Sequence, residues 1–145
     1  MISREQAVAA LFARLTQSGA FVTSTRRNRA PENFTPAQTP ALVLVGDSEI
    51  YVQPAPSQPI RTMMLKALVY FDCGSDENAI PDQQLNNALD AIDQALVPDD
   101  FQSDRCTLGG LVFVAEIEGK VIRAPGDVTG KSLALVPIKL VLDGI

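Results

Sequence analysis

Residues 61–71 read Arg-Thr-Met-Met-Leu-Lys-Ala-Leu-Val-Tyr-Phe, and this segment indicates which kind of fold to expect. Successive side chains of a β-strand point to opposite faces, so a period of two divides this stretch into two faces. One face is apolar throughout and consists of Met63, Leu65, Ala67, Val69 and Phe71. The other face is mixed and holds Thr62, Met64, Lys66, Leu68 and Tyr70. We therefore expect a long strand whose far end is covered on both sides.

Further strands are expected before and after this stretch. Alternation and β-branched residues predict them over residues 21–27, 41–45, 50–53, 111–117, 120–123 and 132–142. Two segments between them, 28–39 and 124–131, lack periodicity and are expected to be surface loops.

Turn residues predict how some of these strands connect. Gly46-Asp47 is expected to end strand 41–45, with 50–53 returning as the second strand of a hairpin and the prolines after it stopping further pairing. Glu118-Gly119 predicts a two-residue hairpin turn before 120–123. Pro137 has no N–H to donate, which predicts an edge position or a bulge for the last strand.

Two amphipathic helices complete the predicted fold. Ser3 followed by Gln6 is a capping-box pair, and apolar residues at helical spacing predict a helix over residues 4–17. The second helix begins near Pro81 and ends before Val97-Pro98. Helices that do not alternate with strands indicate the α+β class. We expect one domain over residues 1–145, with a mainly antiparallel sheet of about five or six strands and two helices packed on one face.

The composition excludes the commonest catalytic chemistries. The 145 residues contain no histidine, which removes Ser-His and Cys-His nucleophile pairs and nearly all catalytic zinc sites. Cys73 and Cys106 are isolated in sequence and are expected to be free thiols. Residues 126–132, GDVTGKS, are one residue short of a phosphate-binding P-loop and lead into a predicted strand. We expect no catalytic residue, no metal, no cofactor and no membrane-spanning segment.

Charge is distributed unevenly along the chain. The net charge is −5, and residues 67–104 contain acidic side chains but no Lys or Arg. Most of these carboxylates are expected on the solvated face of the second helix. Three arginines instead crowd together between residues 26 and 29. Patches of opposite sign on one small domain suit head-to-tail assembly of copies.

The acidic residues also leave a second interpretation open. Carboxylates in segments 72–77 and 99–104 could hold a divalent cation, which would make the chain a small metal-dependent enzyme or ligand-binding domain. The spacing of a calcium-binding loop is absent from residues 72–77. A solvated surface is therefore the preferred interpretation.

The order of segments resembles that of the phage tail terminator and minor tail protein family. The phrases that carry the resemblance are Ile2-Ser-Arg-Glu-Gln, Pro40-Ala-Leu-Val-Leu-Val, the strand 61–71 followed by Asn87-Ala-Leu-Asp-Ala-Ile, Thr107-Leu-Gly-Gly, and Leu135-Val-Pro-Ile-Lys-Leu-Val-Leu. Together they cover nearly the whole chain. The resemblance implies a small α+β protein without an active site that forms a ring, usually a hexamer.

The resemblance also implies where such a ring acts. It caps the finished tail tube, stops tube polymerisation and presents a surface for head attachment. The expected partners are further copies of the chain, the tail tube protein and a head completion protein, in a virion tail assembled in the host cytoplasm. DNA is expected to pass through the channel without specific binding, because six copies at −5 would give a ring about −30. A neck or connector protein is the alternative within this class.

The residues expected at the subunit or tube interface lie in loops and at element ends. They are Arg26, Arg27, Arg29, Phe34, Asp99 and Asp100. Arginine forks pair well with carboxylates, so the arginines are expected to meet acidic groups of the adjacent subunit or tube protein.

Overall fold

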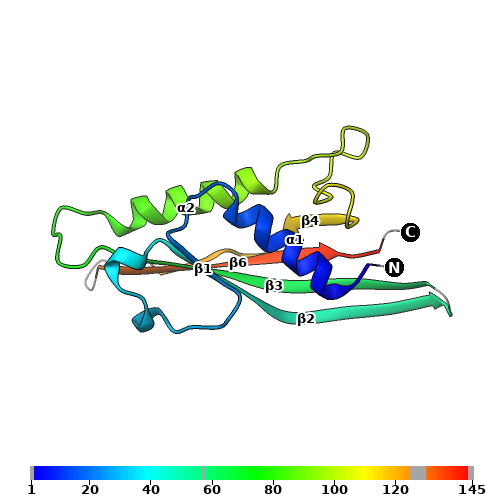
Figure 1. Cartoon of the computed structure of the whole chain (residues 1–145), viewed down its shortest axis with the longest axis horizontal. Coiled ribbons are helices and arrows are strands. Elements are labelled where there is room, and N and C mark those ends of the chain that lie inside the picture. Colours follow the sequence, from blue (N-terminus) through cyan, green and yellow to red (C-terminus); the bar gives the residue numbers. More distant parts are fainter. Residues whose placement is uncertain (1, 57, 125–129, 144–145) are drawn as a thin grey trace.

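The computed structural model describes residues 2–56, 58–124 and 130–143, whose arrangement is shown in Figure 1. Helices α1 (Arg4–Thr16) and α2 (Pro81–Ala95) pack on one face of a six-stranded sheet. The strands are β1 (Thr23–Thr25), β2 (Ala41–Ala55), β3 (Gln58–Asp72), β4 (Val114–Ile117), β5 (Ile122–Ala124) and β6 (Lys131–Val141). The sheet order is β1-β2-β3-β6-β4, with β5 also paired to β6. Every pairing is antiparallel except β1 with β2, which confirms the predicted α+β class.

The main core lies between the two helices and the sheet face that they cover. Its largest fully enclosed side chains are Leu11, Leu15, Leu42, Leu44, Leu65, Leu85, Ile92, Ile138 and Leu140. Burying one such side chain contributes about 1.5–3 kcal/mol. The predicted long strand is the inner strand β3, and its alternate residues Leu65, Ala67 and Val69 all belong to this core. A smaller apolar cluster around Tyr70 covers the far end of β3 on the other face, as predicted.

Both predicted helices are present. The Ser3 hydroxyl accepts a hydrogen bond from the Gln6 amide at 3.0 Å, and the Gln6 side chain accepts one from the Ser3 amide at 3.2 Å. This capping box satisfies backbone donors that the first turn of α1 leaves without helical partners. Beyond the helix, Gly19 adopts a positive φ of 72°, a conformation that glycine reaches at little cost.

Strands β2 and β3 form one long hairpin, which corrects the expected turn at Gly46-Asp47. Gly46 pairs with Leu65 and Ser48 with Met64, so Asp47 is the extra residue of a bulge. The expected return strand 50–53 is the outer half of β2, and the prolines at 54 and 59 lie inside the strands instead of ending them. Pairing along β3 outweighs the local turn signal, because it satisfies the backbone of β2 over most of its length.

The prediction of a second hairpin, with its turn at Glu118-Gly119, is also wrong. Strands β4 and β5 do not pair with each other; both lie along the same edge of β6. Glu118-Gly119 therefore interrupts an edge instead of turning it. The prediction of an edge position or a bulge at Pro137 is wrong, because β6 is an inner strand and its pairing with β3 has no bulge. The interrupted edge is what accommodates the proline. The Pro137 carbonyl accepts from the Glu118 amide at 3.1 Å, so its missing N–H faces the gap between β4 and β5.

The remaining differences concern the extent of the elements. Strand 21–27 shortens to β1, because only Thr23–Thr25 pair with the start of β2. The loop 28–39 contains two short 3₁₀ turns, and most of the expected loop 124–131 falls on residues 125–129, outside the described residues. Within the described ranges, no helix is long and apolar enough to cross a membrane.

Candidate assembly interface

Two of the predicted interface arginines differ sharply in their surroundings. Arg26 forms an ion pair with Glu5 on the first turn of α1, and its Nη2 donates to Oε1 at 2.9 Å. This pairing raises the pKa of Arg26 and lowers the pKa of Glu5. The neighbouring Arg27 is exposed, and no hydrogen bond or ion pair joins its guanidinium to any described residue. Of these two arginines, Arg27 is therefore the one whose charge could bind a group of another molecule.

Phe34 is enclosed by residues of its own chain. Its exposure is 3%, and its ring centroid lies 5.4 Å from that of Tyr70. The Arg29 guanidinium stacks 4.2 Å from the Phe34 centroid and donates to the Asn33 carbonyl at 2.7 Å. Burial and the nearby Glu32 carboxylate raise the pKa of Tyr70. These contacts hold the loop 28–39 against the helix-free face of the sheet.

Asp99 anchors the segment that follows α2. One carboxylate oxygen accepts from the Thr107 amide at 2.7 Å and hydroxyl at 2.8 Å; the other accepts from the Gly109 amide at 3.0 Å and from Arg14 at 3.3 Å. Partial burial alone would raise the pKa of Asp99, but these hydrogen bonds outweigh it and hold the pKa well below its usual range. The side chain is 23% exposed and is fully used inside the chain.

Replacing Asp99 with asparagine is expected to lower the free energy of unfolding by about 1–2 kcal/mol. The new amide nitrogen would face two donors, the Gly109 amide and the Arg14 guanidinium. Because the pKa of Asp99 is lower in the folded state, its contribution is present above the unfolded pKa of about 3.9 and is lost as the pH falls through the folded pKa. Urea unfolding at pH 7 and pH 3 measures both effects, with the exposed Asp93→Asn as control. A larger loss of unfolding free energy at pH 3 than at pH 7 would contradict this account.

Asp100 organises a tight turn directly beyond Asp99. Its carboxylate accepts from the Gln102 amide at 3.1 Å and from the Ser103 hydroxyl at 2.6 Å. Its backbone forms a bridge with Arg105, whose guanidinium lies 3.9 Å from the Phe113 ring centroid. The turn presents Phe101, which sequence reasoning missed and which is 104% exposed. The sequence signal was a single aromatic residue within the polar run of residues 99–105.

The structure does not bring the predicted arginines and aspartates together in one chain. Arg26 is tied to Glu5 in the first turn of α1, whereas Asp99 is tied to Arg14 in its last turn. Glu5 and Arg14 are nine residues apart, which is about 14 Å along the helix axis. A contact between the two groups would therefore have to join different copies, and their role at an interface stays a prediction.

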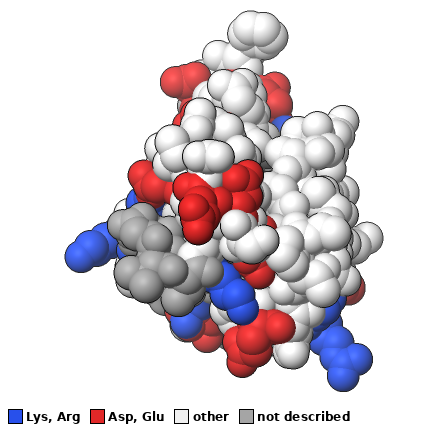
Figure 2. Space-filling view, turned by 90° about the vertical axis from the view of Figure 1, so that its left-hand side faces the viewer, with Lys and Arg blue, Asp and Glu red and all other residues white. Residues whose placement is uncertain are grey.

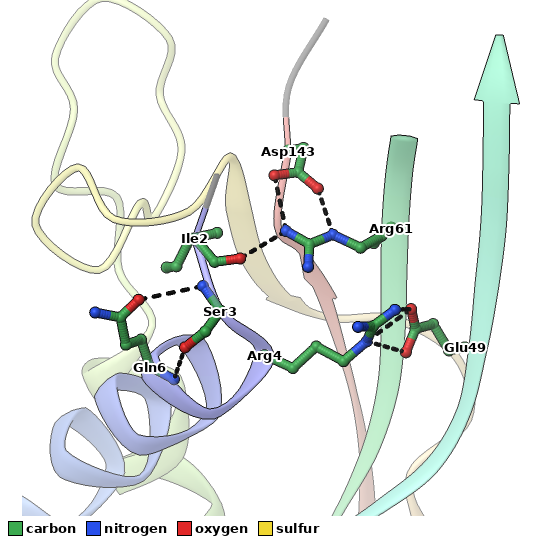
Figure 3. A network of polar contacts seen from close by, with 7 residues as sticks. All are labelled: Ile2, Ser3, Arg4, Gln6, Glu49, Arg61 and Asp143. Carbon is green, nitrogen blue, oxygen red and sulfur yellow. Dashed lines mark hydrogen bonds and ion pairs between the residues drawn. The ribbon is translucent and has the colours of Figure 1, made fainter. Parts of the chain in front are cut away.

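A polar cluster, shown in Figure 3, fixes both described ends of the chain to the β2–β3 hairpin. Arg61 on β3 is almost fully buried; it donates to Asp143 at 2.7 and 3.0 Å and to the Ile2 carbonyl at 2.7 Å. Arg4 on α1 donates to both carboxylate oxygens of Glu49 on β2, at 2.7–3.0 Å. The cluster holds the hairpin beyond its bulge at Asp47, and the part of the hairpin nearer its tip extends beyond the helices in Figure 1.

Acidic side chains gather at the end of the molecule that carries the β3–α2 connection, as Figure 2 shows. The helix face predicted to be solvated is exposed there, and Asp82 pairs with Arg123 at 2.6 Å. The two segments of the metal-site alternative, 72–77 and 99–104, lie at opposite ends of the 15-residue helix α2, about 22 Å apart along its axis. In the described part of the chain, no three Asp, Glu or Cys side chains converge on a point where a metal could bind.

Comparisons with known proteins give a structural likeness without a sequence match. No family model matches the chain, and no curated protein matches it in sequence. A chain from the virion of a native gene transfer agent particle is similar in structure, with a TM-score of 0.58 and 10% identity. The match covers 99% of this chain and 100% of that one. This chain shares its fold with a virion component.

A second solved structure has the same fold. It gives a TM-score of 0.55 at 13% identity, with 99% of each chain covered. At such low identities the likeness concerns the path of the backbone and not the residues of any site. The match extends along nearly the full length of both chains.

Proposed function

We propose that this chain is a structural virion protein whose copies form a ring at the end of a tail tube. The observation that carries the proposal is the end-to-end sharing of a fold with a chain of a gene transfer agent virion. In such a ring the chain would end tube polymerisation and offer the surface to which head completion proteins attach. It would act through surfaces and not through catalysis.

The distribution of charge supports assembly from identical copies. The bend after β1 carries the exposed Arg27, whose guanidinium has no partner among the described residues, and the end of the molecule with the β3–α2 connection is acidic, as seen in Figure 2. When two different surfaces of one chain complement each other, repeated contacts form a closed ring if the rotation between copies closes. A ring with this net charge would repel DNA, so DNA could pass through without adhering.

The solution mass of the purified protein tests the proposal. Light scattering across a concentration series and at two salt levels is expected to show a particle of constant mass, several times the 15.6 kDa of one chain. Negative-stain images should show closed rings. High salt is expected to weaken assembly, because it screens the attraction between exposed charges. At 0.1 M the Debye length, beyond which such charges are largely screened, is about 10 Å. A monomer at every concentration, or an open filament, would contradict a self-assembling ring.

Replacing Arg27 with glutamate is expected to weaken ring assembly by roughly ten-fold per contact while leaving the stability of the monomer unchanged. The expected change in unfolding free energy is within about 0.5 kcal/mol, since exposed side chains without partners contribute little. Lys120→Glu is the matched control, because it makes the same charge change at an exposed position in the interrupted edge. Equal effects of the two variants would mean that net charge and not the position of Arg27 matters.

A further inference from the structure

The turn after α2 holds an aromatic side chain away from the protein. Phe101 has the highest exposure of the large hydrophobic side chains in the described ranges, at 104%. The backbone around it is nevertheless well fixed. Asp104 donates to the Asp100 carbonyl at 2.9 Å, and the Asp99 and Asp100 amides donate to the Arg105 carbonyl at 3.1 and 3.2 Å. We call residues 99–105 the Phe101 turn.

A fixed turn with an exposed aromatic ring has the properties of a binding anchor. An aromatic side chain buries about 150–250 Å² when it enters a pocket, and such residues dominate interface energetics. A surface that is already ordered also loses little conformational entropy on binding. The hydrogen bonds of Asp99 and Asp100 supply that order in the free chain. Nothing in the described part of the chain covers the Phe101 ring.

A hollow that fits such an anchor lies on another part of the molecule. It is bounded by the first turns of α1 and by β2 and β3, and its volume is about 380 Å³. Buried Leu44 and Leu65 and half-buried Met63 give it an apolar floor, and Arg4 and Arg26 stand among its lining residues. A cavity of about 150 Å³ already accepts a benzene ring, so the hollow has room for a phenylalanine side chain.

The two surfaces are complementary in charge. The Phe101 turn holds three aspartates and one arginine, whereas the charged residues lining the hollow are two arginines and one glutamate. At the hollow Arg4 and Arg26 already pair with Glu49 and Glu5. The positive charge left for a partner is that of Arg27, which stands between the lining residues Arg26 and Asn28 and has no ion pair among the described residues. A turn of net negative charge would thus meet this arginine beside the hollow. Opposite potentials favour encounter and fix the orientation of the contact.

The anchor cannot fill the hollow of its own chain. The turn is tied through Asp99 to Arg14, whereas Arg4 of the hollow lies ten residues earlier in α1, about 15 Å away along the helix. In Figure 1 the turn lies at the top of the molecule and β2 at the bottom. A contact between them must therefore join two copies head to tail, which is the kind of contact that closes rings.

We propose that the Phe101 turn of one copy docks into the α1/β2–β3 hollow of the next copy, and that this contact joins neighbouring subunits of the ring. The occupant of the hollow is thus a second copy of this chain. The proposal rests on the proposed function, because it names the surfaces through which the ring would form.

Two variants test the two sides of the contact separately. Phe101→Ala removes the anchor and leaves the hollow intact. Gly46→Leu fills the hollow and leaves the anchor intact, because a Cβ at Gly46 meets no heavy atom within 4 Å and that residue lines the hollow. Each variant alone is expected to lose the ring and to raise the apparent dissociation constant at least roughly ten-fold, a change that one interface anchor commonly accounts for. An equimolar mixture is expected to form a two-chain particle, since only one intact anchor then faces one intact hollow.

Matched controls separate this contact from general effects on the surface. Ile80→Ala shortens another exposed apolar side chain, at 58% exposure, on the acidic end. Ser48→Leu adds a leucine to the same strand as Gly46 but on its other face, because Ser48 pairs with Met64 whereas Gly46 pairs with Leu65. Both controls are expected to assemble like the natural chain, and far-ultraviolet circular dichroism should show that all four variants are folded.

Each outcome of the light-scattering series has a defined meaning. Rings of natural mass from Phe101→Ala would overturn the proposed contact and leave the proposed ring function standing. Equal weakening by Phe101→Ala and Ile80→Ala, or a mixture that yields no two-chain particle, would overturn the contact as well. A natural chain that never assembles would overturn both this contact and the self-assembling ring.

Discussion

Replacing Phe34 with alanine is expected to lower the free energy of unfolding by about 3–4 kcal/mol. The ring is 3% exposed, packs against Tyr70 and lies beneath the Arg29 guanidinium. Its removal would leave a cavity under the loop 28–39 and would free Arg29 from its stacking contact. Urea unfolding monitored by circular dichroism measures the loss.

The matched control is the same chemical change at the other extreme of exposure. Phe101→Ala removes a phenyl ring that contacts solvent, so its unfolding free energy should stay within about 0.5 kcal/mol of the natural value. The pair also separates two roles for Phe34. A pure interface residue would lose assembly and keep stability, as we expect for Phe101. If Phe34→Ala left stability unchanged, the burial of its ring described above would be contradicted.

Replacing Arg61 with methionine is expected to lower the free energy of unfolding by about 3 kcal/mol. Methionine keeps the apolar stem, but it leaves the Asp143 carboxylate and the Ile2 carbonyl without the three hydrogen bonds that Arg61 donates. The Arg61 side chain is 5% exposed and that of Asp143 is 21% exposed, so water replaces these bonds poorly. Both described ends of the chain should loosen, which hydrogen exchange of the Leu142 amide, bonded to the Arg61 carbonyl, would detect.

Arg4→Met is the control for this prediction. Arg4 makes a similar double contact with Glu49, but its side chain is 48% exposed and that of Glu49 is 26% exposed. An exposed ion pair contributes no more than about 1 kcal/mol, because water and salt screen it. Comparable losses in the two variants would show that charge pairing, and not burial of the guanidinium, sets the contribution of Arg61.

Sequence patterns predicted an element correctly where the residues that determine it all lie within one segment. The capping pair Ser3 and Gln6 placed the start of α1, and alternation over residues 61–71 identified a strand that proved to be inner. The solvated side of α2 also followed from the spacing of its apolar residues. In each case the deciding residues lie within a few positions of one another, so the physics is local.

Turns, and the surroundings of the residues predicted at an interface, were harder to read from the sequence. Asp47 looks like part of a turn but forms a bulge, because β3 offers β2 hydrogen-bond partners far beyond that point. Pro137 lies in an inner strand, since the gap between β4 and β5 faces its missing N–H. Phe34 and Asp99 looked available for contacts, yet Tyr70, Thr107 and other residues distant in sequence enclose or bind them.

Patterns within the sequence were thus enough to predict the fold class, the helices and the central strand, and to exclude histidine chemistry. These properties depend on periodicity and composition, which folding does not change. The folded arrangement was needed to show which polar and aromatic groups are already used within the chain and which remain exposed. Hydrogen bonding and burial between segments far apart in sequence make that choice, and they left Arg27 and Phe101 facing outward.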